Sequence, residues 1–420
     1  MIRSLSLALV AGVACSASAQ IFANVDQAAK PSVGVDMQII SDNEIYIDGV
    51  LYESWQEVGL SGALHTAAAR CGLEAMRPAI NVAVDDIVGL ADVNPSDCTF
   101  SRTRIMPDYD PSVERYRIPV VVHVIQRTNG TGFLSNAQVE SQIDILNEDF
   151  QALPGSLGAP GTDMNIEFYL ATEDPQGNPT DGILNHTNNT WFNDGGSYWN
   201  SVAWDTNRYV NIYTNSASGN LGYVPNLPQG GIAGSNSDRV VVLYSSFGRN
   251  APLADFDLGR TGTHEMGHYF GLEHTFSGGC GSSSSCYTTG DLICDTNPES
   301  SPFFGCSSGR STCGSPDPID NYMDYSDDIC MNKFTPEQVN RMRCSLLNYR
   351  PNLYEVVSTD TPCAIGDIAV PFGVLDLGDV DAFIAAFVAG DSAADVAFPF
   401  GLIDLTDIDG FIASFTAGCP

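Results

Sequence analysis

The stretch Gly262-Thr-His-Glu-Met-Gly-His-Tyr-Phe-Gly-Leu-Glu-His274 contains three histidines in the order H-E-x-x-H-x-x-G-x-x-H. His264 and His268 are four residues apart, so on a helix their imidazoles share one face and can bind one Zn²⁺ at about 2.0–2.1 Å. Gly271 can adopt the left-handed conformation that ends a helix, and the chain can then turn to present His274 as a third ligand. The stretch therefore predicts a zinc site that keeps a fourth position for water.

Glu265 lies between the first two histidines and is expected to face the open side of the metal. A carboxylate at this place is the predicted general base, which takes a proton from water and later passes it to the leaving amine. The competing interpretation is three unrelated histidines on a surface helix. Only six histidines occur in the whole chain, and three of them fall in this short stretch, which favours the metal site.

A second motif, Asn321-Tyr-Met-Asp-Tyr325, follows further along the chain. The extended histidine motif followed by a methionine turn is the metzincin signature. Flanking segments narrow the resemblance, over about residues 105–350, to the pappalysin family of metalloproteases. These segments are Arg117-Ile-Pro-Val-Val-Val-His-Val124, His274-Thr-Phe-Ser-Gly-Gly-Cys280, Gly290-Asp-Leu-Ile-Cys-Asp-Thr296 and Asn321-Tyr-Met-Asp-Tyr-Ser-Asp-Asp-Ile-Cys-Met-Asn-Lys-Phe-Thr335.

The resemblance implies an α+β fold with a metzincin-type zincin catalytic domain. Its expected parts are a twisted mixed sheet, an active-site helix and a loop-rich, disulfide-bonded lower half. Met323 is implied to form an apolar floor below the metal, and Tyr325 to stabilise the oxyanion. Asp327 and Asp328 follow closely, and a carboxylate there would favour Arg or Lys just after the scissile bond. The alternative is that these two aspartates bind calcium or solvent.

The predicted organisation is a signal peptide (1–19), a propeptide (20–104), a metzincin catalytic domain (105–352), a linker (353–362) and a dockerin-like two-repeat helical module (363–420). An apolar run after Arg3, followed by Ala17-Ser-Ala19, is typical of a secretory signal. No later stretch is long and apolar enough to span a bilayer, so we expect a secreted protein, extracellular or associated with the cell surface. With 51 acidic against 18 basic residues, no basic face exists for nucleic acid.

Arg70-Cys71-Gly72, within the predicted propeptide, resembles a cysteine switch. A thiolate is a good zinc ligand, so Cys71 would fill the fourth position and keep the precursor latent. The alternative is a Cys71–Cys98 disulfide. Self-activation is predicted by cleavage before Arg102 or Arg104, unless another protease does the trimming.

In an exported chain, cysteines are mostly paired. The resemblance implies the pairs Cys306–Cys330 and Cys280–Cys313. If Cys71 is free, the other ten mature cysteines can all pair, and Cys98 then needs a partner such as Cys344.

Pappalysins also carry calcium in the region after the zinc motif. Asp291, Asp295 and Thr296 offer hard oxygen ligands there, so a calcium site is predicted. A solvated acidic turn is the alternative interpretation.

Patterning predicts strands at 117–126, 165–171, 209–213 and 239–244, and a helix after a Ser135–Gln138 capping box. A helix-like run covers 63–76. Leu221–Pro225 lies where metzincins place the edge strand that receives substrate. Thr335 is expected to cap a helix that runs to about Tyr349.

The C-terminal region repeats itself at an offset of 28 residues, each unit being a loop followed by an apolar helix. It resembles a dockerin-type duplicated calcium loop. However, Ala369 and Pro371, with Ala397 and Pro399 in the second unit, replace the early acidic ligands, which puts calcium binding in doubt. Apolar packing and a Cys363–Cys419 disulfide are expected to hold the units together, and a surface or scaffold partner is the expected use.

Together these features predict a secreted zinc endopeptidase that acts on proteins or peptides. A rival from another class is a catalytically silent binding or adhesion protein on the same fold. The intact Glu265 argues against that rival, because loss of this residue is the sequence sign of a silent site. A second rival is another metzincin family with different specificity.

Overall fold

The structure is a computed structural model that describes residues 34–73, 98, 107–357, 363–369, 372–397 and 401–419. The predicted signal peptide and the two proposed cleavage positions, before Arg102 and Arg104, lie outside these residues. Within the described part of the chain, no helix has the length and hydropathy needed to cross a membrane.

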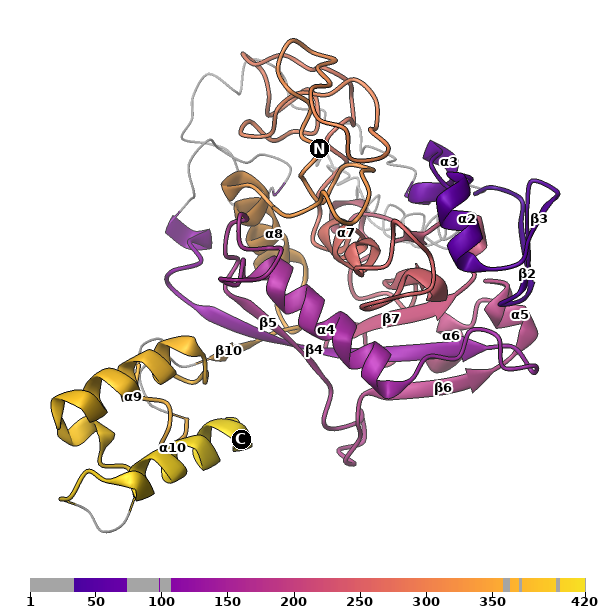
Figure 1. The fold of residues 1–420 in the computed structure, drawn as a ribbon. Helices are drawn as coiled ribbons and strands as arrows, with labels where there is room; N and C mark the ends of the chain where they lie inside the picture. The colour runs from indigo at the N-terminus through magenta and orange to yellow at the C-terminus, as the bar shows by residue number, and fades with distance from the viewer. Residues whose placement is uncertain are drawn as a thin grey trace, which may run out of the picture.

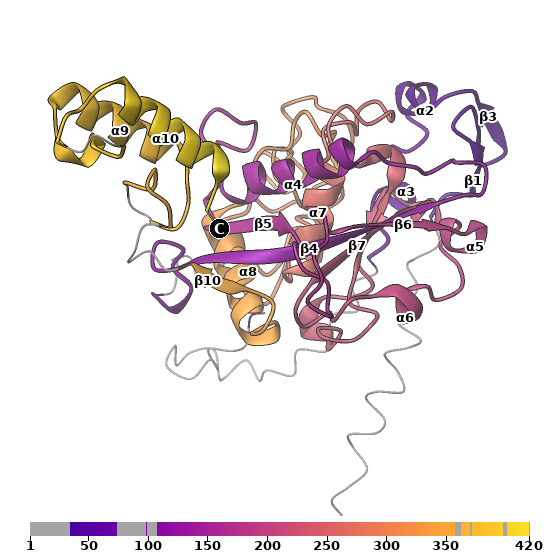
Figure 2. The same ribbon diagram turned by 90° about the horizontal axis from the view of Figure 1, so that it is seen from below.

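A seven-stranded sheet forms the frame of the catalytic region (Figures 1 and 2). Its central strand is β4 (Arg115–Gln126), almost wholly buried because its run of Val and Ile packs on both faces. Parallel neighbours pair along both edges of β4, and β8 and β10 run antiparallel at the two ends of the strand order. The other strands are β5 (Ile166–Leu170), β6 (Ile183–Thr187), β7 (Val210–Asn215), β8 (Gly222–Tyr223), β9 (Val240–Leu243) and β10 (Glu355–Val357). The mixed sheet and the four predicted core strands are confirmed.

Two helices, α4 (Asn136–Phe150) and α7 (Arg260–Tyr269), pack against each other and are joined by a buried polar hub. Asp149 accepts hydrogen bonds from Arg260 at 3.0 Å, from Thr263 at 2.6 Å and from the Tyr322 hydroxyl at 2.8 Å. Because a buried carboxylate needs such partners, this hub fixes α7 relative to α4 and to the methionine turn.

The start of α4 differs in one detail from the predicted capping box. Ser135 accepts from the Gln138 backbone at 3.2 Å, as expected. The Gln138 side chain does not reach back; it donates to the carbonyls of Phe247 and Arg249. The box is therefore half formed, because a tertiary contact competes for the amide.

Beyond α7 the chain forms long loops that lie on the far side of this helix from the sheet (Figure 1). They end at α8 (Pro336–Tyr349), where Thr335 and Gln338 form a full capping box. Two short helices, α5 (Asn189–Phe192) and α6 (Trp199–Val202), lie in the connections between sheet strands.

The N-terminal described segment forms a small sheet, β1 (Met37–Ser41), β2 (Glu44–Ile47) and β3 (Val50–Tyr52), followed by α2 (Trp55–Ser61) and α3 (Ala67–Arg70). It packs on one end of the catalytic sheet, where the Trp55 indole donates to the Tyr244 hydroxyl at 2.8 Å. The predicted helix-like run over 63–76 is wrong for its described part, residues 63–73: Gly62, with φ +69°, ends α2, and four of these residues form α3.

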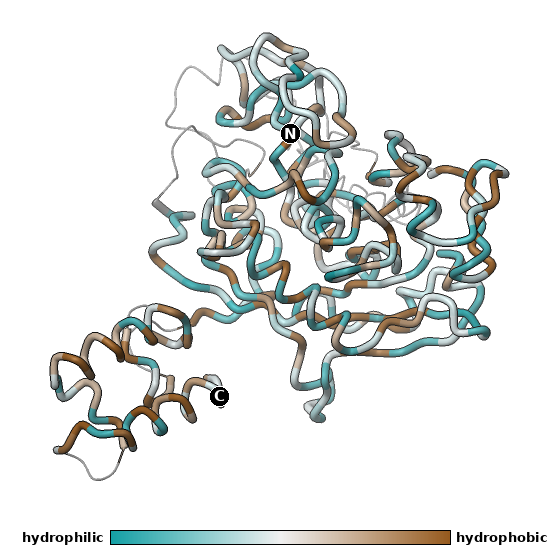
Figure 3. Tube along the Cα trace, in the orientation of Figure 1, coloured by the Kyte–Doolittle hydropathy of each residue, from teal (hydrophilic) through white to brown (hydrophobic). Residues whose placement is uncertain are grey.

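Part of the predicted linker, residues 355–357, forms β10 and pairs with β4, so the sheet extends further along the chain than expected. Beyond it lie α9 (Leu377–Ala389) and α10 (Leu405–Ala417), whose hydrophobic stretches are visible in Figure 3. Phe383 and Phe411 stack with ring centroids 4.2 Å apart, and Cys363 is bonded to Cys419. The expected loop-and-helix pairing of the two repeats is confirmed.

Candidate active site

The three histidines of the motif converge on one buried point. His268 Nε2 lies 3.1 Å from His264 Nε2 and 3.0 Å from His274 Nε2. Gly271, at φ +95°, makes the turn that carries His274 back toward α7. Such a turn strains any residue that has a Cβ, so the glycine of the motif is required.

The remaining ring nitrogens orient these imidazoles. His264 Nδ1 lies 2.6 Å from the Tyr322 carbonyl, and His268 Nδ1 lies 2.7 Å from the Leu272 carbonyl. An Nδ1–H donated to a carbonyl leaves Nε2 free to bind a metal. Burial lowers the pKa of all three histidines, that of His268 to about 4. They are therefore neutral at neutral pH, as zinc ligands must be.

Glu265 is fully buried beside this cluster. Its Oε1 has no hydrogen-bond partner among the described residues, and burial raises the pKa of its carboxyl group. Gly222 of β8 lies directly against it: a Cβ at position 222 would stand 2.6 Å from Glu265 Cγ. The absence of a side chain at Gly222 thus gives Glu265 its room beside the edge strand.

The methionine turn lies under α7. Met323 Sδ packs on Gly267, where an added Cβ would approach it to 2.5 Å. The Tyr325 ring lies 4.9 Å from the His274 ring and 4.8 Å from the Phe276 ring, measured between centroids. Burial raises the pKa of Tyr325 well above its usual value, so its hydroxyl keeps the proton that it would donate.

Cys71 completes the cluster from the N-terminal segment. Its Sγ and the three histidine nitrogens all lie within 4.8 Å of one another. The thiol is free and buried, so the alternative Cys71–Cys98 disulfide is wrong. The flanking backbone pairs with β8: Gly72 N donates to Gly222 O at 3.0 Å, and Leu221 N donates to Ala69 O at 2.7 Å.

The Arg70 side chain is buried next to the histidines, and we call its surroundings, Phe256, Ser326, Asp327 and Asp328, the Arg70 pocket. Its guanidinium lies 4.2 Å from the centre of the Phe256 ring, and Nη2 donates to the Ser326 carbonyl at 2.7 Å. Burial lowers the pKa of Arg70, whereas Asp328 and Asp327 counteract that shift. The two aspartates named from the sequence therefore lie where a buried cationic side chain is held.

Asp327 and Asp328 differ in their own contacts. Asp328 Oδ2 accepts from the backbone of Leu258 at 3.0 Å and of Arg260 at 3.1 Å, so it anchors the start of α7. Asp327 instead lies 3.1 Å from His65, with its Oδ1 near Nε2 of that histidine.

The three proposed calcium ligands do not all lie together in the structure. Asp291 accepts from Thr296 Oγ1 at 2.7 Å, and burial raises the pKa of Asp291 to about 7. Asp295 turns away and accepts from Thr335 Oγ1 at 2.6 Å and from Glu337 N at 2.9 Å, at the start of α8. Asp291 and Thr296 are thus brought together, and Asp295 caps a helix instead.

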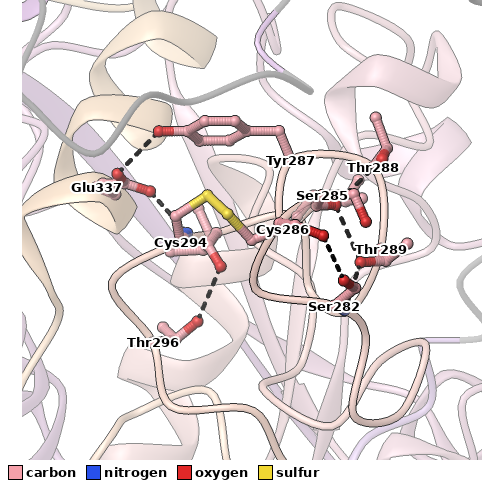
Figure 4. Close-up of a disulfide and its surroundings, with 12 residues drawn as sticks. Ser282, Ser285, Cys286, Tyr287, Thr288, Thr289, Cys294, Thr296 and Glu337 are labelled. Atoms are coloured by element: carbon pink, nitrogen blue, oxygen red, sulfur yellow. Dashed lines mark hydrogen bonds between the residues drawn. A yellow bond between two sulfur atoms is a disulfide. The ribbon is translucent and has the colours of Figure 1, made fainter. Parts of the chain in front are cut away.

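The disulfides agree with the expected pairs. Cys306–Cys330, Cys280–Cys313 and Cys98–Cys344 are present, in addition to the C-terminal bond. A further bond, Cys286–Cys294, ties the loop before Thr296 (Figure 4). There Glu337 accepts from the Tyr287 hydroxyl at 3.2 Å and from Cys294 N at 2.7 Å, which connects this loop to α8.

Sequence reasoning missed two contributors to the site, Phe256 and His65, and named Gly222 only as part of the predicted edge strand. Neither Phe256 nor His65 belongs to the zinc motif, and each lies in a stretch with no chemical signature of its own. Only the packing of separate segments around α7 shows their place.

A convergent three-histidine cluster with a buried glutamate on a helix, facing an edge strand, defines the class of zinc metalloproteases. Residues 197–347 match the Peptidase M43 family, described as pregnancy-associated plasma protein-A. An extracellular metalloprotease of Verticillium alfalfae is 35% identical over 277 residues, covering 64% of this chain and 88% of the relative. Extracellular metalloprotease 1 of Coccidioides posadasii is 36% identical over 241 residues, covering 54% and 76%.

The chain belongs to this pappalysin-like family and is a metalloendopeptidase. Among solved structures, Tannerella forsythia promirolysin is 35% identical, with a TM-score of 0.49, covering 57% of this chain and 84% of that one. Mature mirolysin of the same organism, in complex with a cleaved peptide, is 36% identical, with a TM-score of 0.48, covering 57% and 98%. Both fungal relatives are named extracellular, which supports secretion of this chain.

Proposed function

We propose that this chain is a secreted, zinc-dependent endopeptidase that is made as a latent precursor and cuts before Arg or Lys. The observation that carries the proposal is the placement of two adjacent residues. Cys71 joins the histidine cluster, while Arg70 fills the neighbouring acidic pocket.

His264, His268 and His274 would hold the zinc, because their Nε2 atoms converge and their rings are neutral. Zinc held there would supply Lewis-acid chemistry, which would polarise a carbonyl and lower the pKa of water. Glu265 takes the proton of that water and returns it to the leaving amine. The Tyr325 hydroxyl donates a hydrogen bond to the oxyanion.

Substrate would bind along β8 by backbone pairing, because β8 is an edge strand beside Glu265. In the precursor, Ala69 and Gly72 occupy these backbone groups, and the Cys71 thiolate would take the zinc position needed for water. Latency would therefore depend on the zinc–thiolate bond, which would also hold Arg70 and the paired backbone in the cleft. Without that bond, the segment could leave β8.

The preference for a basic residue rests on Arg70. A guanidinium stacked on Phe256, with Asp327 and Asp328 nearby, is a favourable cation site. Once Arg70 leaves, the pocket would accept Arg or Lys from the leaving side of a substrate.

The N-terminal residues would serve secretion and latency. Residues 1–19 would direct secretion, and residues 20–104 would be the propeptide, cut before Arg102 or Arg104. This cut would separate the backbone of the propeptide from that of the catalytic domain, residues 105–352.

Calcium would bind at Asp291 and Thr296, with Asp295 contributing only after turning away from α8. The dockerin-like module, residues 363–420, would meet a surface or scaffold partner. The exposed apolar side chains Leu377 and Leu405, at equivalent places in the two repeats, are available for such a contact.

The test compares uncleaved precursors on peptides that differ only in the residue after the scissile bond. Cys71→Ser should be active without processing and should favour Arg and Lys, whereas wild type stays inert until cut. The double variant Cys71→Ser, Glu265→Ala is the matched control and should be inert. An inactive Cys71→Ser precursor would argue against the switch, and equal cleavage before Arg and Glu against the pocket.

A further inference from the structure

Three side chains with metal-binding atoms meet beside the Arg70 pocket, where the N-terminal segment touches the catalytic region. His65 Nε2 lies 3.1 Å from Asp327 Oδ1 and 4.0 Å from Asp255 Oδ2. One ligand atom of each residue lies within 4.8 Å of the other two. Because His65 follows α2, Asp255 precedes α7 and Asp327 follows the methionine turn, only the tertiary fold brings them together.

Two of these atoms have only an ion pair with each other. His65 Nε2 and Asp327 Oδ1 lie 3.1 Å apart and are buried, and neither makes a hydrogen bond within the described residues. Asp327 as a whole is only 9% exposed. Buried polar atoms that make no hydrogen bond cost free energy, and a shared cation would coordinate both of them. Their 3.1 Å separation equals that between Nε2 of His264 and Nε2 of His268.

The local charge favours a divalent cation. Asp255, Asp327 and Asp328 bring three carboxylates to this place, against the guanidinium of Arg70 and that of Arg260 near Asp328. Asp327, next to burial, raises the pKa of Asp255, which shows that the two carboxylates repel each other. A bound cation would remove that repulsion.

The types of ligand atom indicate which cation the site would bind. One imidazole nitrogen with carboxylate oxygens suits zinc, whereas calcium prefers oxygen ligands alone. The Asp255 side chain is 38% exposed, so solvent can reach the site and supply the remaining ligand. The rings of Phe256 and Phe304, with centroids 5.6 and 6.5 Å from that of His65, hold the imidazole in place.

The structure assigns a second zinc site to His65, Asp255 and Asp327, one that exists only in the precursor. The restriction to the precursor rests on the proposed function, in which residues 20–104 are a propeptide. A cation there links the propeptide to both loops that border the pocket, shortly before Arg70 and Cys71. Loss of the propeptide removes His65 and leaves Asp327 free for substrate.

Metal counting on the full-length Glu265→Ala precursor tests the site, because this variant cannot process itself. After equilibration with zinc chloride and gel filtration, we expect two zinc ions per chain. Adding His65→Ala should leave one, and adding Asp255→Asn should weaken the second site at least tenfold. His186→Ala, which removes a histidine outside both clusters, should still bind two.

One zinc ion in the Glu265→Ala precursor, or two after His65→Ala, would overturn the assignment and leave a plain histidine–aspartate pair. The Asp255→Asn variant keeps the test valid if His65→Ala fails to fold. The count is independent of catalysis and latency, so its failure is distinguishable from that of the proposed function, which the Cys71→Ser precursor tests.

Discussion

At the residue scale, the site depends on how little space surrounds Glu265. Its carboxylate is enclosed by α7, by Cys71 Sγ at 3.6 Å from Oε2, and by the bare backbone of Gly222. The residues that shape this space contribute to catalysis through position, because a displaced general base loses its alignment with water and carbonyl.

Replacing Glu265 by Ala should leave zinc bound and the fold intact while activity falls by about 10²–10⁴-fold or more, since only the general base is removed. Zinc content and peptide cleavage, measured on propeptide-free enzyme, check this outcome. Near-normal turnover in the zinc-loaded variant would contradict the role of Glu265.

Gly222→Ala should lower kcat/KM by on the order of 10²-fold, because the new Cβ would meet Glu265 Cγ at 2.6 Å and displace the carboxylate. Gly366→Ala is the matched control, since its added Cβ would lie 3.2 Å from a flexible Ser414 Oγ in the C-terminal module. Zinc content should stay normal in both. Equal activity of the two variants would show that the space at position 222 does not matter.

At the scale of elements, the loop from Asp291 to Thr296 is held against α8, where Arg341 donates to the Asp291 carbonyl at 3.1 Å. The Asp291 carboxylate is buried and accepts hydrogen bonds from two nearby donors, Thr296 Oγ1 and Ile293 N. These hydrogen bonds lower the pKa of Asp291, but burial has the larger effect and raises it from the ordinary 3.8 to about 7. A bound calcium ion would offset the cost of ionising this group.

Without calcium, ionised Asp291 should destabilise the fold. Because its pKa is higher in the folded state, the native state binds the proton more tightly than the unfolded chain does. The contribution of Asp291 to the free energy of unfolding therefore falls as the pH rises from about 4 to about 7. Relative to Asp291→Asn, wild type should therefore lose a few °C of Tm across that range. Both chains carry Glu265→Ala to prevent self-digestion.

Calcium chloride at pH 8 should restore the Tm of the chain with Asp291 and leave that of Asp291→Asn unchanged. Thermal unfolding with and without calcium measures both effects. A response to calcium that is equal in the two chains would place the ion elsewhere.

At the scale of the whole molecule, the Cys98–Cys344 bond changes what propeptide cleavage achieves. It joins residues 246 positions apart and crosses the proposed boundary at 104/105. Cutting before Arg102 or Arg104 would break the backbone but leave the propeptide tied to α8. A tethered segment keeps a high effective concentration near the cleft and can rebind.

Processed wild type should therefore run as one species on a non-reducing gel and as two after reduction. The double variant Cys98→Ser, Cys344→Ser should release its propeptide on cleavage and show higher activity at equal enzyme concentration. Release of the propeptide from processed wild type without reductant would mean that the activating cut lies between residues 71 and 98.

The sequence by itself determined the chemistry of the centre. The spacing of His264, Glu265, His268 and His274 specifies one helical face and one turn, so the ligand set follows from local geometry alone. Core strands were predictable for a similar reason, because β4 is rich in Val and Ile and β9 consists of Val and Leu, as is typical of strands buried in a sheet. Three disulfides followed from family resemblance and parity, and Cys363–Cys419 from the repeat, whereas Cys286–Cys294 was not predicted.

The tertiary structure decided what surrounds that centre. Arg70, His65 and Phe256 acquire roles only because the N-terminal segment folds back onto β8 and the methionine turn, contacts that span some 150–260 residues of sequence. Side chains such as Asp295 and Gln138 bind distant partners instead of the expected local ones. Local patterns cannot encode these choices, because each depends on which competing donor or acceptor the completed fold brings within hydrogen-bond distance.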